Sequence, residues 1–269
     1  MATKVILRDV VPDGEYFAAR SGDSPFPPGF LLAPGTELAR PTPAWQFPEV
    51  GHEPVIPFDY QVVYEDSRIL VVDKPHFLPA TPNGRIVRET LQTRLRARYG
   101  DKITVIHRLD RLTAGLMLAV KNPEDRAAYH ELFSRREVRK TYLARLSLPM
   151  DPQPWQELRL GMRKEGRRVV VDKHGTQTVT LWRTLDDDPT RRTVELRPLT
   201  GHTHQLRVVC AHLGAGIFGD DMYPVERELD LYDYSEPLHL LATSLEFSDP
   251  LDGSAREFLS ARGLPTRMV

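Results

Sequence analysis

One segment of the sequence places an acidic residue between two basic ones, a pattern that suits a reactive carboxylate. Residues 107–121 read H-R-L-D-R-L-T-A-G-L-M-L-A-V-K, so Asp110 lies between Arg108 and Arg111. An aspartate is ionised at neutral pH in water, and a nearby guanidinium keeps it ionised in a partly closed pocket. Such a carboxylate can act as a nucleophile or as a general base. The alternative is a structural salt bridge.

A second segment gathers histidines and a cysteine, and it invites a zinc interpretation. Residues 200–214 read T-G-H-T-H-Q-L-R-V-V-C-A-H-L-G and contain the one cysteine of the chain. Their apolar residues recur at helical spacing, which places His204 and His212 roughly 11–12 Å apart along a helix axis, too far to share an ion. If the segment were a strand, His202 and His204 would share a face and could bind metal. We therefore expect a helix, and a metal-dependent hydrolase is kept as an alternative. The apolar positions are Leu206, Val209, Cys210 and Leu213.

The elements that must position these residues are short and of mixed type. Apolar runs bounded by turn residues predict strands over 68–73, 104–106, 116–120, 140–148, 169–171, 178–182 and 193–196. A basic helix is predicted over 88–99, closed by Gly100, and another from a cap at Asn122 to about Arg136. Because strands and helices mix without a regular βαβ rhythm, the pattern favours an α+β fold.

The first 57 residues differ in composition from the rest. They hold 10 of the 23 prolines, so we expect little regular structure there and interpret residues 1–57 as an irregular arm laid against a domain formed by residues 58–269. The arm also carries more aromatic surface than a disordered tail usually does. It could contact RNA or simply pack against the domain. Its aromatic residues include Phe17, Phe26, Phe30, Trp45 and Phe47.

Composition and charge narrow the class of protein. The 269 residues are 41% hydrophobic and 27% charged, as in an ordinary globular protein, and no apolar run approaches the roughly 18 residues of a membrane span. Lys4 interrupts any early signal-peptide core, so we expect a cytoplasmic protein. Residues 81–145 hold 15 Lys or Arg against 7 Asp or Glu, whereas residues 219–253 hold one against 10. A basic middle region suits a polyanionic partner.

The ordered motifs resemble those of one enzyme family. H-R-L-D-x-x-T-x-G-L at residues 107–116, then K-x-Y-L-A at 140–144, then T-G-x-T-H-Q-L-R at 200–207 are similar to the RluA-type pseudouridine synthases. V-V-D-K-P at 71–75 and F-G-D-D-M-Y at 218–223 resemble further motifs of that family. The match spans about residues 60–250. It implies the pseudouridine synthase fold, an α+β fold with a mixed, mostly antiparallel central sheet flanked by helices.

The resemblance also implies roles for particular residues. Asp110 stands at the position of the family's catalytic aspartate, Tyr142 at that of the tyrosine that stacks on uracil, and Arg207 at that of the arginine that pairs with the aspartate. Three departures accompany the match. Ala114 replaces a common serine, His202 replaces a common arginine, and residues 1–57 do not look like the S4 RNA-binding domain of many relatives. Further substrate or RNA contacts are implied at Arg108, His107, Lys74, His204 and Leu240.

The implied reaction is the isomerisation of specific uridines to pseudouridine in structured RNA, either rRNA or tRNA. It needs a carboxylate that attacks C6 or C1′ or removes a 2′ proton, and it needs no cofactor, no metal and no membrane. We expect a monomer that binds an RNA stem-loop. A catalytically inactive RNA-binding protein of the same fold is the other alternative. Candidate phosphate contacts are Arg85, Arg88, Arg94, Arg96, Arg98, Arg135, Arg136, Arg139 and Lys140.

Overall fold

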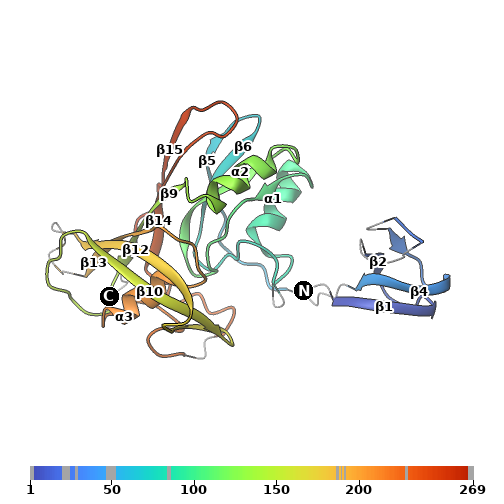
Figure 1. Cartoon of the computed structure of the whole chain (residues 1–269), viewed down its shortest axis with the longest axis horizontal. Helices are drawn as coiled ribbons and strands as arrows, with labels where there is room; N and C mark the ends of the chain where they lie inside the picture. Colours follow the sequence, from blue (N-terminus) through green and yellow to red (C-terminus); the bar gives the residue numbers. More distant parts are fainter. Residues whose placement is uncertain are drawn as a thin grey trace. The chain divides into compact units, whose positions relative to one another are not determined.

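The structure is a computed structural model that divides into two compact units. It describes residues 3–19, 25–27, 30–46, 53–83, 86–185, 188, 190, 192–227 and 230–265. The smaller unit comprises residues 1–53 and 82–88, and the larger comprises residues 54–81 and 89–269. Figure 1 shows the elements of both units along the chain.

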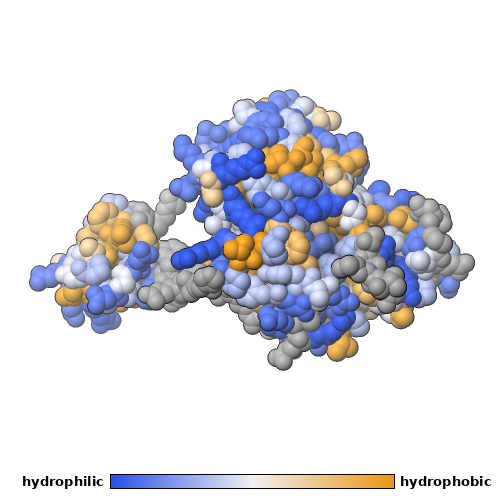
Figure 2. Space-filling model, turned by 180° about the vertical axis from the view of Figure 1, so that it is seen from behind, coloured by the Kyte–Doolittle hydropathy of each residue, from blue (hydrophilic) through white to orange (hydrophobic). Residues whose placement is uncertain are grey.

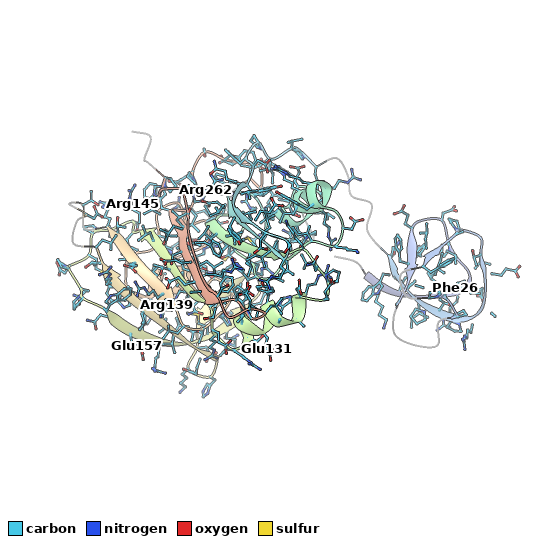
Figure 3. The ribbon with its side chains drawn as sticks, turned by 90° about the horizontal axis from the view of Figure 1, so that it is seen from above. Phe26, Glu131, Arg139, Arg145, Glu157 and Arg262 are labelled. Carbon is cyan, nitrogen blue, oxygen red and sulfur yellow. The ribbon has the colours of Figure 1, made fainter. Side chains whose placement is uncertain are left out.

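The smaller unit contains a sheet where the sequence predicted an irregular arm. Strands β1 (Thr3–Val10), β2 (Tyr16–Ala18), β3 (Leu31–Leu32) and β4 (Glu37–Gln46) form a four-stranded antiparallel sheet in the order β1-β4-β2-β3. Phe26, labelled in Figure 3, packs against the buried core of this sheet. The prediction of sparse regular structure is therefore wrong for the described part of residues 1–57. The core residues are Leu7, Val11, Tyr16, Ala18, Leu32, Leu38 and Ala44.

The short length of β2 explains how this sheet tolerates its prolines. Pro41 and Pro43 lie inside β4, which pairs with β2 only through residues 44–46. At both prolines β4 therefore pairs with β1 but has no partner residue in β2. A missing N–H is tolerated at such an edge-like position. The number of prolines does not show which side of a strand is paired. The prediction of sparse regular structure was therefore wrong here.

The larger unit is built on an 11-stranded sheet in the order β11-β10-β12-β13-β9-β14-β8-β6-β5, with β15 paired to β14 and β7 to β8. Among its described strand pairs, β14 with β8 is parallel and the others are antiparallel. Together with the helices this confirms the predicted α+β fold with a mostly antiparallel sheet. The strands are β5 (Gln61–Glu65), β6 (Ile69–Lys74), β7 (Thr104–Val105), β8 (Ala114–Val120), β9 (Arg139–Arg145), β10 (Gln156–Glu165), β11 (Arg168–Val171), β12 (Thr176–Thr184), β13 (Thr193–Pro198), β14 (Leu240–Ser248) and β15 (Ala255–Leu259).

Two neighbouring strands form the centre of the larger unit. Every residue of β6 and β8 is buried, as expected for apolar runs covered on both faces. Helix α2 (Arg126–Ser134) inserts Tyr129 and Leu132 into the core cluster that these strands share with β14 and β15. Helix α3 (Gln205–His212) lies by β10, β12 and β13 (Figure 1). Figure 2 shows a mostly hydrophilic outer surface interrupted by smaller hydrophobic patches.

Most predicted elements of the larger unit are present, and their boundaries differ where caps decide them. Helix α1 (Leu91–Tyr99) begins after Thr90, whose hydroxyl accepts from the Thr93 N–H, and it ends at Gly100 as predicted. Helix α2 begins at Arg126, because the predicted cap residue Asn122 instead donates to the Asp125 carboxylate within a preceding turn. The long strand β10 was not predicted.

A glycine permits the one parallel contact of the described sheet. Gly115 has φ +117°, and a Cβ at this position would lie 2.3 Å from the Ala242 carbonyl oxygen of β14. A side chain would therefore force β8 and β14 apart. Since Gly115 follows the loop that carries Asp110, this close approach helps to fix that loop in place.

We predict that Gly115→Ala lowers the free energy of unfolding by about 3 kcal/mol, because steric overlap adds to the cost of a left-handed backbone. Gly253→Ala is the matched control: Gly253 has φ +75° and open space around its Cβ position, so only the backbone cost of about 1 kcal/mol applies. Denaturant unfolding of the two variants measures the difference, and equal losses would refute the close-packing argument.

Candidate active site

The loop that carries Asp110 joins β7 to β8 and is tied to the end of β6. The Thr113 N–H donates to the Asp110 carbonyl at 3.1 Å, which closes a turn. Lys74 is fully buried, and its Nζ donates to the carbonyls of Pro75 and Leu78 and, at 3.3 Å, to that of Arg111. Lys74 was expected to contact RNA. In the structure its side chain is instead wholly buried and braces the loop from inside.

His107, at the start of the same loop, has a structural hydrogen bond. Its Nε2 accepts from the Leu118 N–H at 3.0 Å, and its ring stacks on Phe133 with centroids 4.7 Å apart. Burial, with a further contribution from the Lys140 charge, lowers the pKa of His107 to about 3. The imidazole is therefore neutral, and Nε2 is its unprotonated nitrogen. It lines the cavity and also anchors the loop.

Arg207 projects from α3 and is 4% exposed. Its Nε donates to Asp220 Oδ2 at 2.8 Å, and its Nη2 donates to Asp220 Oδ1 and Asp221 Oδ1 at 2.5 Å each. Burial opposes its charge, but the hydrogen bonds and charge of Asp220, with Asp110 and Asp221, raise the pKa of Arg207 above its ordinary value. Two partners thus hold the guanidinium, and its Nη1 remains directed to Asp110.

Asp110 is three-quarters buried, with one-quarter of its side chain exposed to the cavity. Arg207 Nη1 lies 3.9 Å from Asp110 Oδ2, and His204 Nε2 lies 3.9 Å from the same oxygen. The predicted pairing of Arg207 with Asp110 is present as an ion pair at this distance. The closer partners of Arg207, however, are Asp220 and Asp221.

Tyr142 lies on β9, where its strand neighbours are Leu196 of β13 and Ala242 of β14. It is 8% exposed. Burial, followed by the charge of Asp110, raises the pKa of Tyr142 above its ordinary value, so the phenol is neutral. Leu240 begins β14 and lines the same cavity, as the sequence predicted for a wall residue.

The structure brings these side chains together in one cavity of about 1520 Å³. Asp110, Tyr142 and Arg207 all line it, although 97 positions of sequence separate the first from the last. Of the residues predicted to contact substrate, Lys74 is absent from this lining. The others that line it are Arg108, His107, His204 and Leu240.

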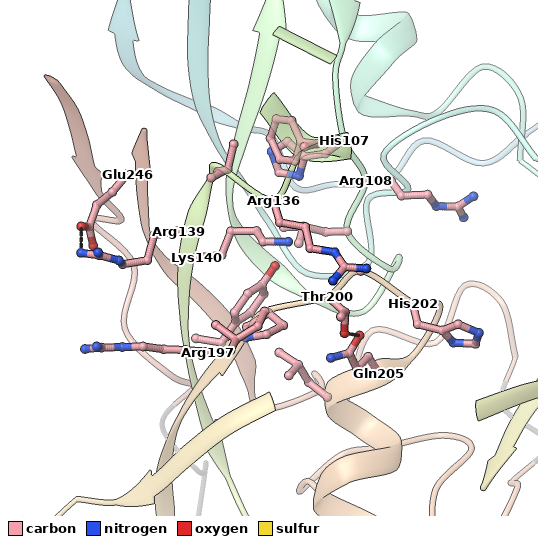
Figure 4. A pocket seen from close by; sticks show the side chains of 18 of the residues that line it. His107, Arg108, Arg136, Arg139, Lys140, Arg197, Thr200, His202, Gln205 and Glu246 are labelled. Atoms are coloured by element: carbon pink, nitrogen blue, oxygen red, sulfur yellow. Dashed lines mark hydrogen bonds and ion pairs between the residues drawn. The ribbon is translucent and has the colours of Figure 1, made fainter. Parts of the chain in front are cut away.

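The mouth of the cavity is strongly basic. Figure 4 shows Arg136 and Lys140 over its centre, with Arg108 and His202 on one side of the view and Arg139 and Arg197 on the other. Arg139 is paired with Glu246 at 3.1 Å. Burial lowers the pKa of Lys140. By contrast Arg94, another predicted phosphate contact, pairs with Glu89 and donates to the Phe58 and Ile56 carbonyls, and Arg85 lies outside the described residues.

Comparison with known proteins identifies the family. The family model for RNA pseudouridylate synthase matches residues 68–212, more than half of the chain. The dual-specificity RNA pseudouridine synthase RluA of Vibrio parahaemolyticus is 36% identical over 199 residues, which cover 70% of this chain and 78% of that protein. The chain belongs to the RluA-type RNA pseudouridine synthases. It is therefore an RNA isomerase, as the motifs predicted.

Two further comparisons agree with this assignment. The ribosomal large subunit pseudouridine synthase D of Xanthomonas campestris is 32% identical to the synthase over 177 residues, 60% of this chain and 51% of that protein. A structure of human RNA pseudouridylate synthase domain containing 1 is 25% identical and covers 78% of this chain and 86% of that one, with a TM-score of 0.60. The synthase thus shares its fold with structures of the same family.

The histidine-rich segment of the synthase forms the predicted helix. His204 caps the start of α3 and His212 ends it, while Leu206, Val209 and Cys210 are buried on its inner side. Among the described residues, no three histidine, cysteine or acidic side chains gather as metal ligands would. In the same part of the chain no helix is long and apolar enough to cross a membrane.

Sequence reasoning missed the residues that hold the site in place. Asp220, Asp221 and Tyr223 were noted as part of a family motif but were given no role. Gln205 was also overlooked: its amide donates to Thr180 Oγ1 at 2.9 Å, and its oxygen accepts from Thr200 at 3.1 Å.

The neutral state of His107 predicts a pH dependence of stability. Its native pKa of about 3 lies below the unfolded value of 6.5, so between these pH values the unfolded chain binds the extra proton and the fold loses stability as pH falls. In His107→Gln the amide oxygen can still accept from Leu118 but does not titrate. We expect wild type to lose about 2 kcal/mol more than this variant between pH 6.5 and 5.0.

Denaturant unfolding across this range measures the effect, and the exposed His130 on α2 provides the control variant His130→Gln. Parallel stability curves for wild type and His107→Gln would contradict the structural role given to the neutral imidazole.

Proposed function

We propose that Asp110 is the catalytic carboxylate of this synthase, that Tyr142 stacks on the uracil and that Arg207 holds the carboxylate ionised and oriented. The observation that carries the proposal is that these three side chains line one cavity. A charged acid, a fixed cation and a neutral aromatic ring are the groups that the isomerisation of a uridine needs.

The bonds that change explain this requirement. The N1–C1′ bond of uridine breaks, the detached uracil rotates, and a C5–C1′ bond forms while C5 gives up its proton and N1 takes one. The products and substrates have the same atoms, so no redox partner or phosphate donor is involved. Asp110 supplies the reacting carboxylate, and the ring of Tyr142 stabilises the base by roughly 1–3 kcal/mol of stacking while it turns.

The basic mouth suits the RNA around the target uridine. A base in a stem must leave its stack before it can reach Asp110, at a cost of a few kcal/mol. Cationic side chains that bind the flanking phosphates offset this cost. Arg108, Arg136 and Lys140 surround the entrance and are placed for such contacts. RNA binding to this face would weaken steeply with added salt.

The substrate we propose is a stem-loop of rRNA or tRNA. The name of the relative in Vibrio parahaemolyticus supports an RNA substrate, and that of the relative in Xanthomonas campestris supports RNA of the large ribosomal subunit. We further propose that residues 58–269 act as the catalytic domain, because both the family match and the cavity lie within that range. A cytoplasmic monomer is also part of the proposal. A contact between RNA and the smaller unit stays a prediction.

The test of this proposal uses RNA labelled with tritium at uracil C5. Isomerisation must release the label into water, because C5 exchanges its hydrogen for the bond to C1′. We predict that Asp110→Asn abolishes release, by at least about 10⁴-fold, while RNA binding persists. Asp101→Asn is the matched control, since Asp101 lies exposed in a turn outside the cavity.

Filter binding of the same RNA separates loss of catalysis from loss of affinity. Full tritium release by Asp110→Asn would remove the catalytic assignment, and equal loss in Asp101→Asn would point to a general effect of removing charge.

A further inference from the structure

We infer that His204 is a positioning residue that acts with Arg207 on a single oxygen of Asp110, Oδ2, and leaves Oδ1 as the atom that meets the uridine. The inference rests on the proposed role of Asp110 and goes beyond it by assigning separate tasks to the two carboxylate oxygens. It follows from a chain of hydrogen bonds that begins on strand β11.

The Tyr223 hydroxyl lies between β11 and His204. The N–H of Val169 on β11 donates to the Tyr223 hydroxyl oxygen at 2.7 Å. The hydroxyl lies 2.9 Å from His204 Nδ1. While its oxygen accepts from Val169, the phenol can donate its own proton to Nδ1. Burial raises the pKa of Tyr223, so that proton stays on the phenol.

The contact with Tyr223 determines the tautomer of His204. Burial, as the largest cause, lowers the pKa of His204, so the imidazole is neutral and carries one proton. A neutral imidazole whose Nδ1 accepts a hydrogen bond must carry its proton on Nε2. That N–H faces Asp110 Oδ2 at 3.9 Å. Tyr223 thus sets which nitrogen of His204 presents a donor to the acid.

The two carboxylate oxygens of Asp110 have different surroundings. Arg207 Nη1 also lies 3.9 Å from Oδ2, while its Nε and Nη2 are engaged by Asp220 and Asp221. Both nitrogens therefore approach Asp110 most closely at Oδ2, at a distance longer than a direct hydrogen bond. In the described part of the chain, no hydrogen bond to Asp110 Oδ1 is present. The carboxylate is held on one side and left available to the cavity on the other.

The backbone of His204 supports this assignment. His204 has φ +55° at the start of α3, a left-handed conformation that few residues other than glycine adopt. Such a conformation persists where surrounding contacts impose it, and it is frequent at functional sites. Here the contacts are those with Tyr223 and Asp110, including ring packing against Tyr223 with centroids 5.6 Å apart.

The decisive measurement is the tautomer of His204. In ¹⁵N-histidine-labelled full-length protein, the His204 signals are assigned by their loss in His204→Asn, a residue that tolerates a left-handed backbone. We expect an unprotonated Nδ1 and a protonated Nε2. A proton found on Nδ1 would overturn the inference, and this test is independent of whether Asp110 is catalytic.

Kinetics provide the second measurement. Tyr223→Phe removes the donor to Nδ1, and we expect the single-turnover rate of tritium release to fall about tenfold with the RNA dissociation constant unchanged. Tyr232→Phe, whose phenol lies outside the cavity, is the matched control and should keep the wild-type rate. A wild-type rate in Tyr223→Phe would overturn the inference while leaving the assignment of Asp110, tested by Asp110→Asn, intact.

Discussion

The buried ion pair between Arg207 and Asp220 is the interaction on which the site depends. Both side chains are almost fully inaccessible, at 4% and 1% exposure. Removing an arginine and an aspartate from water is costly unless hydrogen bonds satisfy both groups. Asp220 meets that condition by accepting from two nitrogens of Arg207 and from the N–H groups of Met222 and Tyr223. The same acid thereby orders the segment that carries Tyr223.

The ion pair between Arg207 and Asp220 positions the other side chains of the site. Arg207 presents one remaining nitrogen to Asp110, and Tyr223 presents a hydroxyl to His204. On the other side, Lys74 and His76 hold the carbonyls of Arg111 and Leu112, so the Asp110 loop is braced from β6. The acid is thus positioned by buried groups from three distant segments. Arg108 and Arg136 at the mouth are exposed, and in the proposed function they would meet RNA.

The sequence predicted the residues proposed to react better than the residues that support them. Asp110, Tyr142 and Arg207 were found because each lies in a short motif, and the structure brings them to one cavity. Asp220 was given no role, since its hydrogen bonds to Arg207 cross a loop that local patterns do not describe. Lys74 was misjudged for a similar reason: a lysine in a motif looks like a surface cation until the strand that carries it proves to be buried on every side. The small N-terminal sheet was missed because Pro41 and Pro43 lie in a part of β4 that has no partner residue in β2, which proline content alone does not reveal.

The claim that Arg207 positions Asp110 through its bond to Asp220 has a direct test. The measurement is the single-turnover rate of pseudouridine formation by Asp220→Asn in the full chain, with the RNA dissociation constant determined in parallel and the fold checked by thermal unfolding. The account predicts a rate at least about tenfold lower at unchanged affinity, because a neutral amide holds the guanidinium less firmly than a carboxylate. A folded Asp220→Asn protein that works at the wild-type rate would contradict it.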